Sequence, residues 1–198
     1  MSSNSRCESP DQASRRSALV ALAAIVFAGP TAAQIAGPVS PPAPVEVQSD
    51  LPGASLRGQA RLRFFGLHVY DIRLWAPTAV RGDDASRTSA ALEIEYARHL
   101  KGPLIAERSL SEMQRVGNFS ASDGERWLAL MKQLFPDVQA GDRITSVHRP
   151  GEGARFHVNG RLAGEVRDAT FARLFFSIWL SPRTSEPQLR TALLGLAP

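Results

Sequence analysis

The stretch RLRFFGLHVYDIRLW, residues 61–75, decides the fold that we predict for this chain. Basic and apolar residues alternate in it up to Phe64, and a period of two is typical of a β-strand. After Gly66, residues 67–75 are again rich in aromatic and β-branched side chains, which suit a pleated sheet. A glycine inside such a run marks a bend. The stretch is therefore either one long bent strand or a tight hairpin with Gly66 at its turn.

Further strands are predicted on both sides of a helical region. Residues 91–98 alternate between apolar and charged positions, as a half-buried strand does, and residues 142–148 form another strand candidate. Asn159-Gly160 follows, between two short runs, and this dipeptide favours a type I′ hairpin turn. In that hairpin we expect the facing pairs to be Val158 with Arg161 and His157 with Leu162.

Four helices are predicted from their caps and apolar stripes. The first runs from Gly102 to about Val116, and the second follows a capping box formed by Ser122 and Glu125. Asp168 caps a third helix over 169–180, and a short last helix starts near Pro187. The second helix has a stripe typical of core packing, not of a cofactor site: Trp127, Leu128, Met131, Leu134 and Phe135. Segregated strands and helices predict an α+β fold with an antiparallel sheet covered by helices on one side.

The amino-acid composition limits the classes of function that we expect for this chain. A chain of 198 residues with 43% hydrophobic and 21% charged residues suits a domain with a full core. The net charge of +4 is small and scattered, so we expect no nucleic-acid partner. The only cysteine is Cys7, and the four histidines form no H-x-x-x-H or H-E-x-x-H pair, so the sequence predicts no zinc site.

The N-terminus has the pattern of a signal peptide over residues 1–33. Arg15 and Arg16 precede a short apolar run, residues 18–28, and small residues up to Ala33 suit cleavage. A retained membrane anchor is the alternative, and the two arginines also resemble a twin-arginine signal for export in the folded state. We expect a periplasmic or secreted protein, with no stable membrane span after the signal is removed.

A proline-rich linker is predicted between this signal and the folded part. Residues 34–49 contain four prolines between positions 38 and 44, a composition typical of an extended tether. The globular domain is therefore expected over residues 50–198.

Four segments together carry a resemblance to a known family: residues 61–75, the Ile105–Gly117 helix, residues 142–166 and residues 171–195. They resemble the chalcone isomerase-like family, and more specifically its secreted bacterial branch. The resemblance covers about residues 50–195. It implies an open-faced β-sandwich, in which a large antiparallel sheet and a helix layer enclose a cleft.

Family members that are enzymes cyclise a chalcone to a flavanone, with an arginine that stabilises the phenolate and hydroxyl groups that polarise the ketone. Arg57 is the candidate for that arginine, and Ser177 falls where the enzymes have Thr or Ser. Phe65 falls where they have a threonine, and residues 104–113 contain no tyrosine. The resemblance therefore favours binding over catalysis, since other branches bind fatty acids or act as non-catalytic helpers.

Three functions follow as hypotheses. The first is a binder of a small apolar or amphipathic, fatty-acid-like molecule, whose cleft residues are Arg57, Arg63, Phe65, Tyr70, Phe175 and Ser177. The second is an intramolecular lyase, with Arg57 and Ser177 as catalytic candidates. The third is a haem-binding protein with His68 or His99 as axial ligand, although a lone histidine on a strand is more often structural. No other cofactor is expected.

Overall fold

The computed structural model describes residues 41–81 and 88–196. The predicted signal peptide, residues 1–33, and the linker up to residue 40 lie outside the described residues. Eleven elements are present: α1 (Val45–Asp50), β1 (Ser55–Phe64), β2 (Leu67–Ala76), β3 (Ala90–Tyr96), α2 (Gly102–Val116), α3 (Ala121–Leu134), β4 (Arg143–Arg149), β5 (Gly153–Val158), β6 (Arg161–Val166), α4 (Ala169–Leu180) and α5 (Pro187–Leu194).

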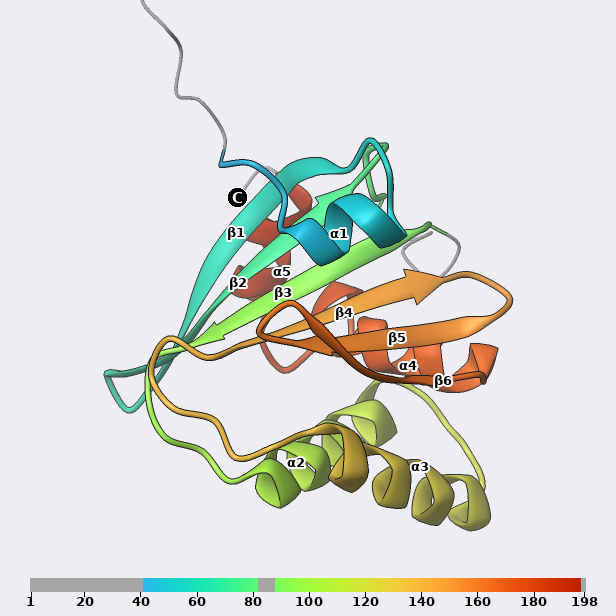
Figure 1. The fold of residues 1–198 in the computed structure, drawn as a ribbon. Coiled ribbons are helices and arrows are strands. Elements are labelled where there is room, and N and C mark those ends of the chain that lie inside the picture. The colour runs from blue at the N-terminus through green and yellow to red at the C-terminus, as the bar shows by residue number, and fades with distance from the viewer. Residues whose placement is uncertain (1–40, 82–87, 197–198) are drawn as a thin grey trace, which may run out of the picture. The chain divides into compact units, whose positions relative to one another are not determined.

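The strands form one six-stranded antiparallel sheet in which their order follows the chain, from β1 to β6 (Figure 1). Helices α2 and α3 are inserted between β3 and β4, and α4 and α5 follow β6. The predicted α+β class, an antiparallel sheet with a helix layer, is confirmed.

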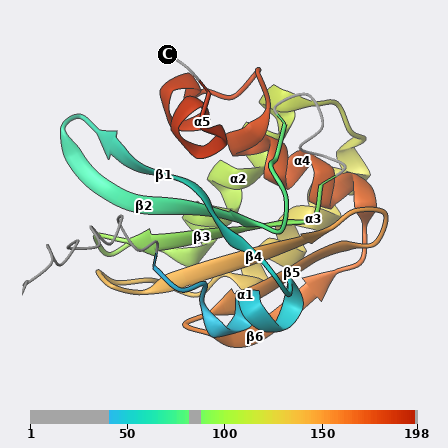
Figure 2. The same cartoon turned by 90° about the horizontal axis from the view of Figure 1, so that it is seen from above.

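The sheet has two differently covered faces. On its inner face α4 packs against β4 and β5, α5 packs against β1 and β2, and α2 packs against α4. Figure 2 shows these helices on one side of the sheet and α1 alone on the other. The inner face carries the large core, which includes Ile72, Leu92 and Phe156 of the sheet and Phe171 and Phe175 of α4. The helix layer is therefore what encloses space above the sheet.

The two predicted hairpins are both present, and both have two-residue turns with positive φ angles. Phe65 and Gly66 have φ values of 48° and 78°, and Asn159 and Gly160 have values of 50° and 82°. This is the pattern of a type I′ turn, which matches the twist of the flanking strands. Residues 61–75 are thus the tight hairpin, not the bent strand. The pairs His157 with Leu162 and Val158 with Arg161 are confirmed.

Two expectations about the helices are wrong. Residues 45–49 of the predicted linker belong to α1, not to an extended tether. Trp75 and Val147 leave an apolar area on the outer face, and Val47 and Leu51 cover it. Helix α3 is capped by Ser120, not by a Ser122–Glu125 box. The Ser120 hydroxyl accepts from the backbone N–H of Asp123 at 3.1 Å, two residues earlier than predicted.

The last helix lies unusually close to the first strand. A Cβ atom on Gly58 of β1 would come within 2.3 Å of the carbonyl oxygens of Ala192 and Leu193 in α5. Only a residue without a side chain allows this approach. The two ends of the domain are therefore packed against each other.

Candidate ligand-binding site

A cavity of about 300 Å³ lies between the inner face of the sheet and helices α2 and α4. Its wall is mainly apolar, with Leu62, Ile94 and Ile144 from the strands and Ile105 and Ile178 from the helices. Small-molecule sites are typically concave, mostly apolar and of this size or larger, with a few polar groups that orient the ligand. The cavity therefore has the dimensions and lining of a ligand site.

A β-bulge shapes the strand side of the cavity. In the β1–β2 pair Leu62 lies opposite Tyr70 and Arg63 opposite His68, so Val69 has no partner. Such an extra residue breaks the alternation of side chains between the two faces. Val69 and Tyr70, although adjacent in sequence, both line the cavity.

Two tyrosines supply hydroxyl groups to the cavity wall. Tyr70 and Tyr96 pack edge to face, with ring centroids 6.2 Å apart, and Trp179 Nε1 donates to Tyr70 Oη at 3.0 Å. Burial raises the pKa of Tyr70 to about 12 and also raises the pKa of Tyr96. Both side chains are therefore neutral phenols. Because the Tyr70 oxygen accepts from Trp179, its own proton can be donated to a ligand.

Four charged residues also contribute to the cavity wall: Arg108 and Glu112 of α2, Lys101 just before it, and Glu186 at the start of α5. Arg108 Nη2 lies 2.7 Å from Glu112 Oε1, and Arg115 Nε donates to Glu112 Oε2 at 3.1 Å. The carboxylate of Glu112 is buried, whereas Arg108 is mostly exposed. Lys101, in contact with Asp137 at 2.7 Å, also contributes to the wall. An amphipathic ligand can therefore place its chain among the apolar groups and its head near Arg108 and Lys101.

Two of the six predicted binding residues line this cavity, namely Tyr70 and Phe175. The other four do not. Arg57 is the unpaired residue of a second bulge in β1 and donates its guanidinium to the backbone oxygens of Ala76 and Pro77. Ser177 donates to the Arg173 carbonyl at 2.6 Å on its own helix, since it lies about 200° around α4 from Phe175. The expectation that Arg57 and Ser177 lie in the cleft is wrong.

The remaining candidates lie at the end of the β1–β2 hairpin or in a loop. Phe65 is a turn residue with 89% of its surface exposed, and Arg63 donates to the Gly66 carbonyl. His68 is 3.2 Å from Asp71, and His99 is exposed in the loop before α2. None of these four lines the cavity, so their predicted place in the cleft is also wrong. The cavity therefore contains neither of the two histidines that the haem hypothesis requires as axial ligand.

Sequence reasoning missed the contribution of α2 altogether. Ser109 and Glu112 are buried on the same side of α2 as Ala106 and Met113. Polar residues within an otherwise apolar helical stripe are the signal that could have identified them, because buried polar groups need partners.

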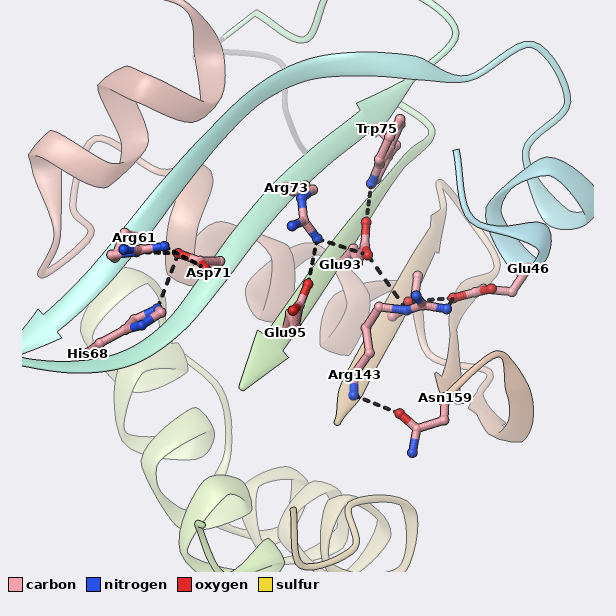
Figure 3. A network of polar contacts seen from close by, with 11 residues as sticks. Glu46, Arg61, His68, Asp71, Arg73, Trp75, Glu93, Glu95, Arg143 and Asn159 are labelled. Atoms are coloured by element: carbon pink, nitrogen blue, oxygen red, sulfur yellow. Dashed lines mark hydrogen bonds and ion pairs between the residues drawn. The ribbon is translucent and has the colours of Figure 1, made fainter. Parts of the chain in front are cut away.

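The outer face of the sheet carries a network of ion pairs, in contrast to the apolar cavity of the inner face (Figure 3). Glu93 is buried and accepts from Trp75 Nε1 at 2.8 Å and from Arg73 Nη1 at 3.1 Å. The same Arg73 nitrogen donates to the exposed Glu95 at 3.1 Å. These contacts give the buried carboxylate of Glu93 two donors, so its role is structural.

Helix α1 is bound to this network by its two acidic residues. Glu46 accepts from Thr145 Oγ1 at 2.8 Å and from Arg143 Nη2 at 3.1 Å. Asp50 contacts His157 Nε2 at 2.8 Å and accepts from Arg155 Nη1 at 2.9 Å. Although burial acts to raise it, these two hydrogen bonds hold the pKa of Asp50 below its ordinary value.

Within residues 41–81 and 88–196, no cluster of three or more His, Cys, Asp or Glu side chains has the arrangement of a metal site. None of the helices in these segments combines the length and the hydropathy needed to cross a bilayer.

Comparisons with known proteins agree with this architecture. The model of the family described as chalcone isomerase-like matches residues 39–195. The solved structure of a fatty-acid binding protein from Arabidopsis thaliana is similar, with a TM-score of 0.60 and 15% sequence identity, over 72% of this chain and 87% of that chain. At this identity the likeness shows a common fold. A search of curated proteins found no match.

Proposed function

This chain belongs to the chalcone isomerase-like family, and we propose that it is an exported, non-catalytic member of the secreted bacterial branch that binds a small apolar or amphipathic molecule. The observation that carries the proposal is the apolar cavity of about 300 Å³ between the sheet and helices α2 and α4. The export part rests on the signal-peptide pattern of residues 1–33 and on no structural observation.

The polar groups of the cavity favour a ligand with a hydrogen-bond acceptor, such as a fatty acid. Tyr70 has a free proton to donate, and Arg108 and Lys101 carry the positive charge that a carboxylate needs. The similar Arabidopsis protein is a fatty-acid binding protein, which supports this ligand class by analogy of fold.

The cyclisation hypothesis has less support from the cavity. It requires a cation beside the developing phenolate and a hydroxyl beside the ketone. Arg57 and Ser177 were the candidates, and both lie outside the cavity with backbone partners. The buried tyrosines remain neutral and thus provide no phenolate base.

Filling the cavity from α2 tests the proposal. Ser109 is buried, lines the cavity and donates to the Ile105 carbonyl at 2.8 Å. This bond to the carbonyl group four residues earlier in the helix contributes little to helix stability, so Ser109→Leu fills the cavity at small cost. We expect cis-parinaric acid, a fluorescent fatty acid, to bind the purified full chain saturably, and Ser109→Leu to weaken binding by about tenfold or more.

Ser111 offers a matched control on the same helix. It is exposed and does not line the cavity, so Ser111→Leu introduces the same side chain without filling space. This variant should bind the probe like the wild type, with both variants checked for folding by circular dichroism. Absence of saturable binding in the wild type, or equal weakening by the two variants, would contradict the proposal.

A further inference from the structure

The tip of the β1–β2 hairpin exposes large apolar side chains that the described part of the chain does not cover. Phe64 is 64% exposed, Phe65 89% and Leu67 56%. Figure 2 shows the β1–β2 ribbon extending beyond the end of β3, and Tyr70 is the first residue of β2 that pairs with β3. Contiguous exposed apolar side chains of this kind mark interaction sites.

The geometry of the turn indicates that these side chains do not stabilise the fold. Phe65 has a φ of 48°, in the left-handed region that disfavours bulky residues. The equivalent position of the β5–β6 turn is Asn159, whose Oδ1 accepts from the backbone N–H of Arg143 at 2.8 Å. The Phe65 ring only packs edge-on against Phe64, with centroids 4.5 Å apart. Phe65 therefore gives the domain no comparable stabilisation.

The exposed tip is continuous with the cavity. Phe64 pairs with Leu67, and two positions further along β1 Leu62 pairs with Tyr70. Residues two apart on a strand, and residues directly opposite each other, share a face of the sheet. Leu62 and Tyr70 line the cavity, so an apolar row runs from the cavity out to the tip. Leu104, at 61% exposure, belongs to the lining on the α2 side.

The charges beside this row are mainly positive. Arg63 is exposed and donates to the Gly66 carbonyl, and within the described segments no carboxylate pairs with it. Arg98 is exposed in the loop between β3 and α2, next to Ala97, whose N–H donates to the Val69 carbonyl at 2.9 Å. Arg108 is also largely exposed. Aromatic side chains with flanking cations are typical of segments that enter an anionic bilayer surface.

We propose that the hairpin tip inserts into the surface of an anionic lipid bilayer and brings the cavity onto the membrane. The apolar row then offers an amphipathic ligand a path between bilayer and cavity; this transfer role rests on the proposed function, whereas the insertion does not. A narrow projecting turn suits a bilayer, which accepts separate apolar side chains, better than a protein partner, which requires about 800 Å² of complementary surface.

Tryptophan placed at the tip would report insertion directly. The three native tryptophans are buried, with exposures of 1% for Trp75, 1% for Trp127 and 7% for Trp179. In Phe65→Trp, brominated phosphatidylcholine in vesicles containing phosphatidylglycerol should quench a blue-shifted fluorescence component. Leu162→Trp is the matched control, because Leu162 is 61% exposed on β6, at the opposite edge of the sheet. It should not be quenched, and the full chain is used in both cases.

Sequence changes at the tip separate insertion from ligand binding. The double change Phe64→Ser with Phe65→Asn should reduce the fraction of the chain that binds to anionic vesicles by about tenfold or more. The same variant should still bind cis-parinaric acid in solution. Ser109→Leu should give the reverse result. Arg63→Glu in the Phe65→Trp background should weaken quenching on anionic vesicles only.

Three results would overturn the proposal. The first is equal quenching of the Phe65→Trp and Leu162→Trp variants, and the second is no quenching of Phe65→Trp on vesicles that sediment with the chain. The third is the loss of a dimer in size-exclusion chromatography when the tip is changed. The last would indicate a contact between copies of the chain. Failure of ligand binding with retained quenching would contradict only the proposed function.

Discussion

The two faces of the sheet use their residues in opposite ways. The outer face places Glu93, Glu46 and Asp50 in ion pairs and hydrogen bonds, and α1 covers the apolar residues between them. The inner face is covered by the helix layer and still leaves a cavity of about 300 Å³. Stability from polar pairing is therefore concentrated on one face, and the space for a ligand lies on the other.

The largest effect is expected from removing the central carboxylate of the outer face. Glu93→Ala leaves the Trp75 indole N–H without its acceptor and removes the buried partner of Arg73, which should lower the free energy of unfolding by about 3 kcal/mol. Urea unfolding at neutral pH measures this loss. Binding of a fatty-acid probe by the folded variant should be unchanged, since Glu93 points away from the cavity.

Glu95 provides the matched control for this change. It accepts from the same Arg73 nitrogen at the same 3.1 Å, but its side chain is 43% exposed, compared with 4% for Glu93. An exposed ion pair contributes less than about 1 kcal/mol, so Glu95→Ala should be nearly neutral. Equal losses from the two variants would show that burial does not decide the strength of these pairs.

The pH dependence of stability should separate the two faces. On the inner face, burial lowers the pKa of His148 from 6.5, so the unfolded chain takes up a proton first and stability falls as the pH drops below 6.5. On the outer face, the pKa of Asp50 lies below 3.8 in the folded state, so its stabilisation is present above 3.8 and is lost as the pH falls through the lower value.

Single substitutions identify the two pH ranges in which stability changes. Relative to His148→Phe, the wild type should lose stability mainly below pH 6.5, whereas its advantage over Asp50→Asn should shrink only below pH 3.8. Urea unfolding at a series of pH values gives both differences. If both differences changed in one common window, the assignment of either group would be wrong.

The smallest effect is expected from the one hydroxyl that we assign to the ligand. Tyr70→Phe removes a neutral donor, so the affinity for a fatty acid should fall by about threefold to tenfold. Affinity for N-phenyl-1-naphthylamine, an apolar probe without a carboxylate, should be retained. The two probes are compared by fluorescence titration, and equal losses for both would mean that Tyr70 shapes the cavity and does not donate to the ligand.

Much of the fold could be predicted because its signals are local. Asn159-Gly160 predicts its turn from the backbone angles that these two residues tolerate, and Asp168 caps α4 as expected through the N–H groups of Thr170 and Phe171. Helix α1 could not be predicted, because its six residues are helical only where Val47 meets Trp75 of a distant strand.

The site was less predictable, since it depends on small shifts of register. The bulge at Val69 changes which side chains face inward, and the bulge at Arg57 turns that side chain toward backbone carbonyls. A period-of-two pattern contains no information on such insertions. Tyr70 and Phe175 do line the cavity: Phe175 lies on the regular helix α4, and Tyr70, next to the bulge, keeps its pairing with Leu62.

The close packing of α5 against Gly58 has a consequence for the order of folding. Each strand pairs with the strand before it in the chain, so most strand pairs can form through contacts of short sequence separation. The contact between α5 and β1 joins almost the two ends of the domain and needs the longest loop to close. Strand β1 is thus the first strand to be synthesised and the last to have its inner face covered, by α5.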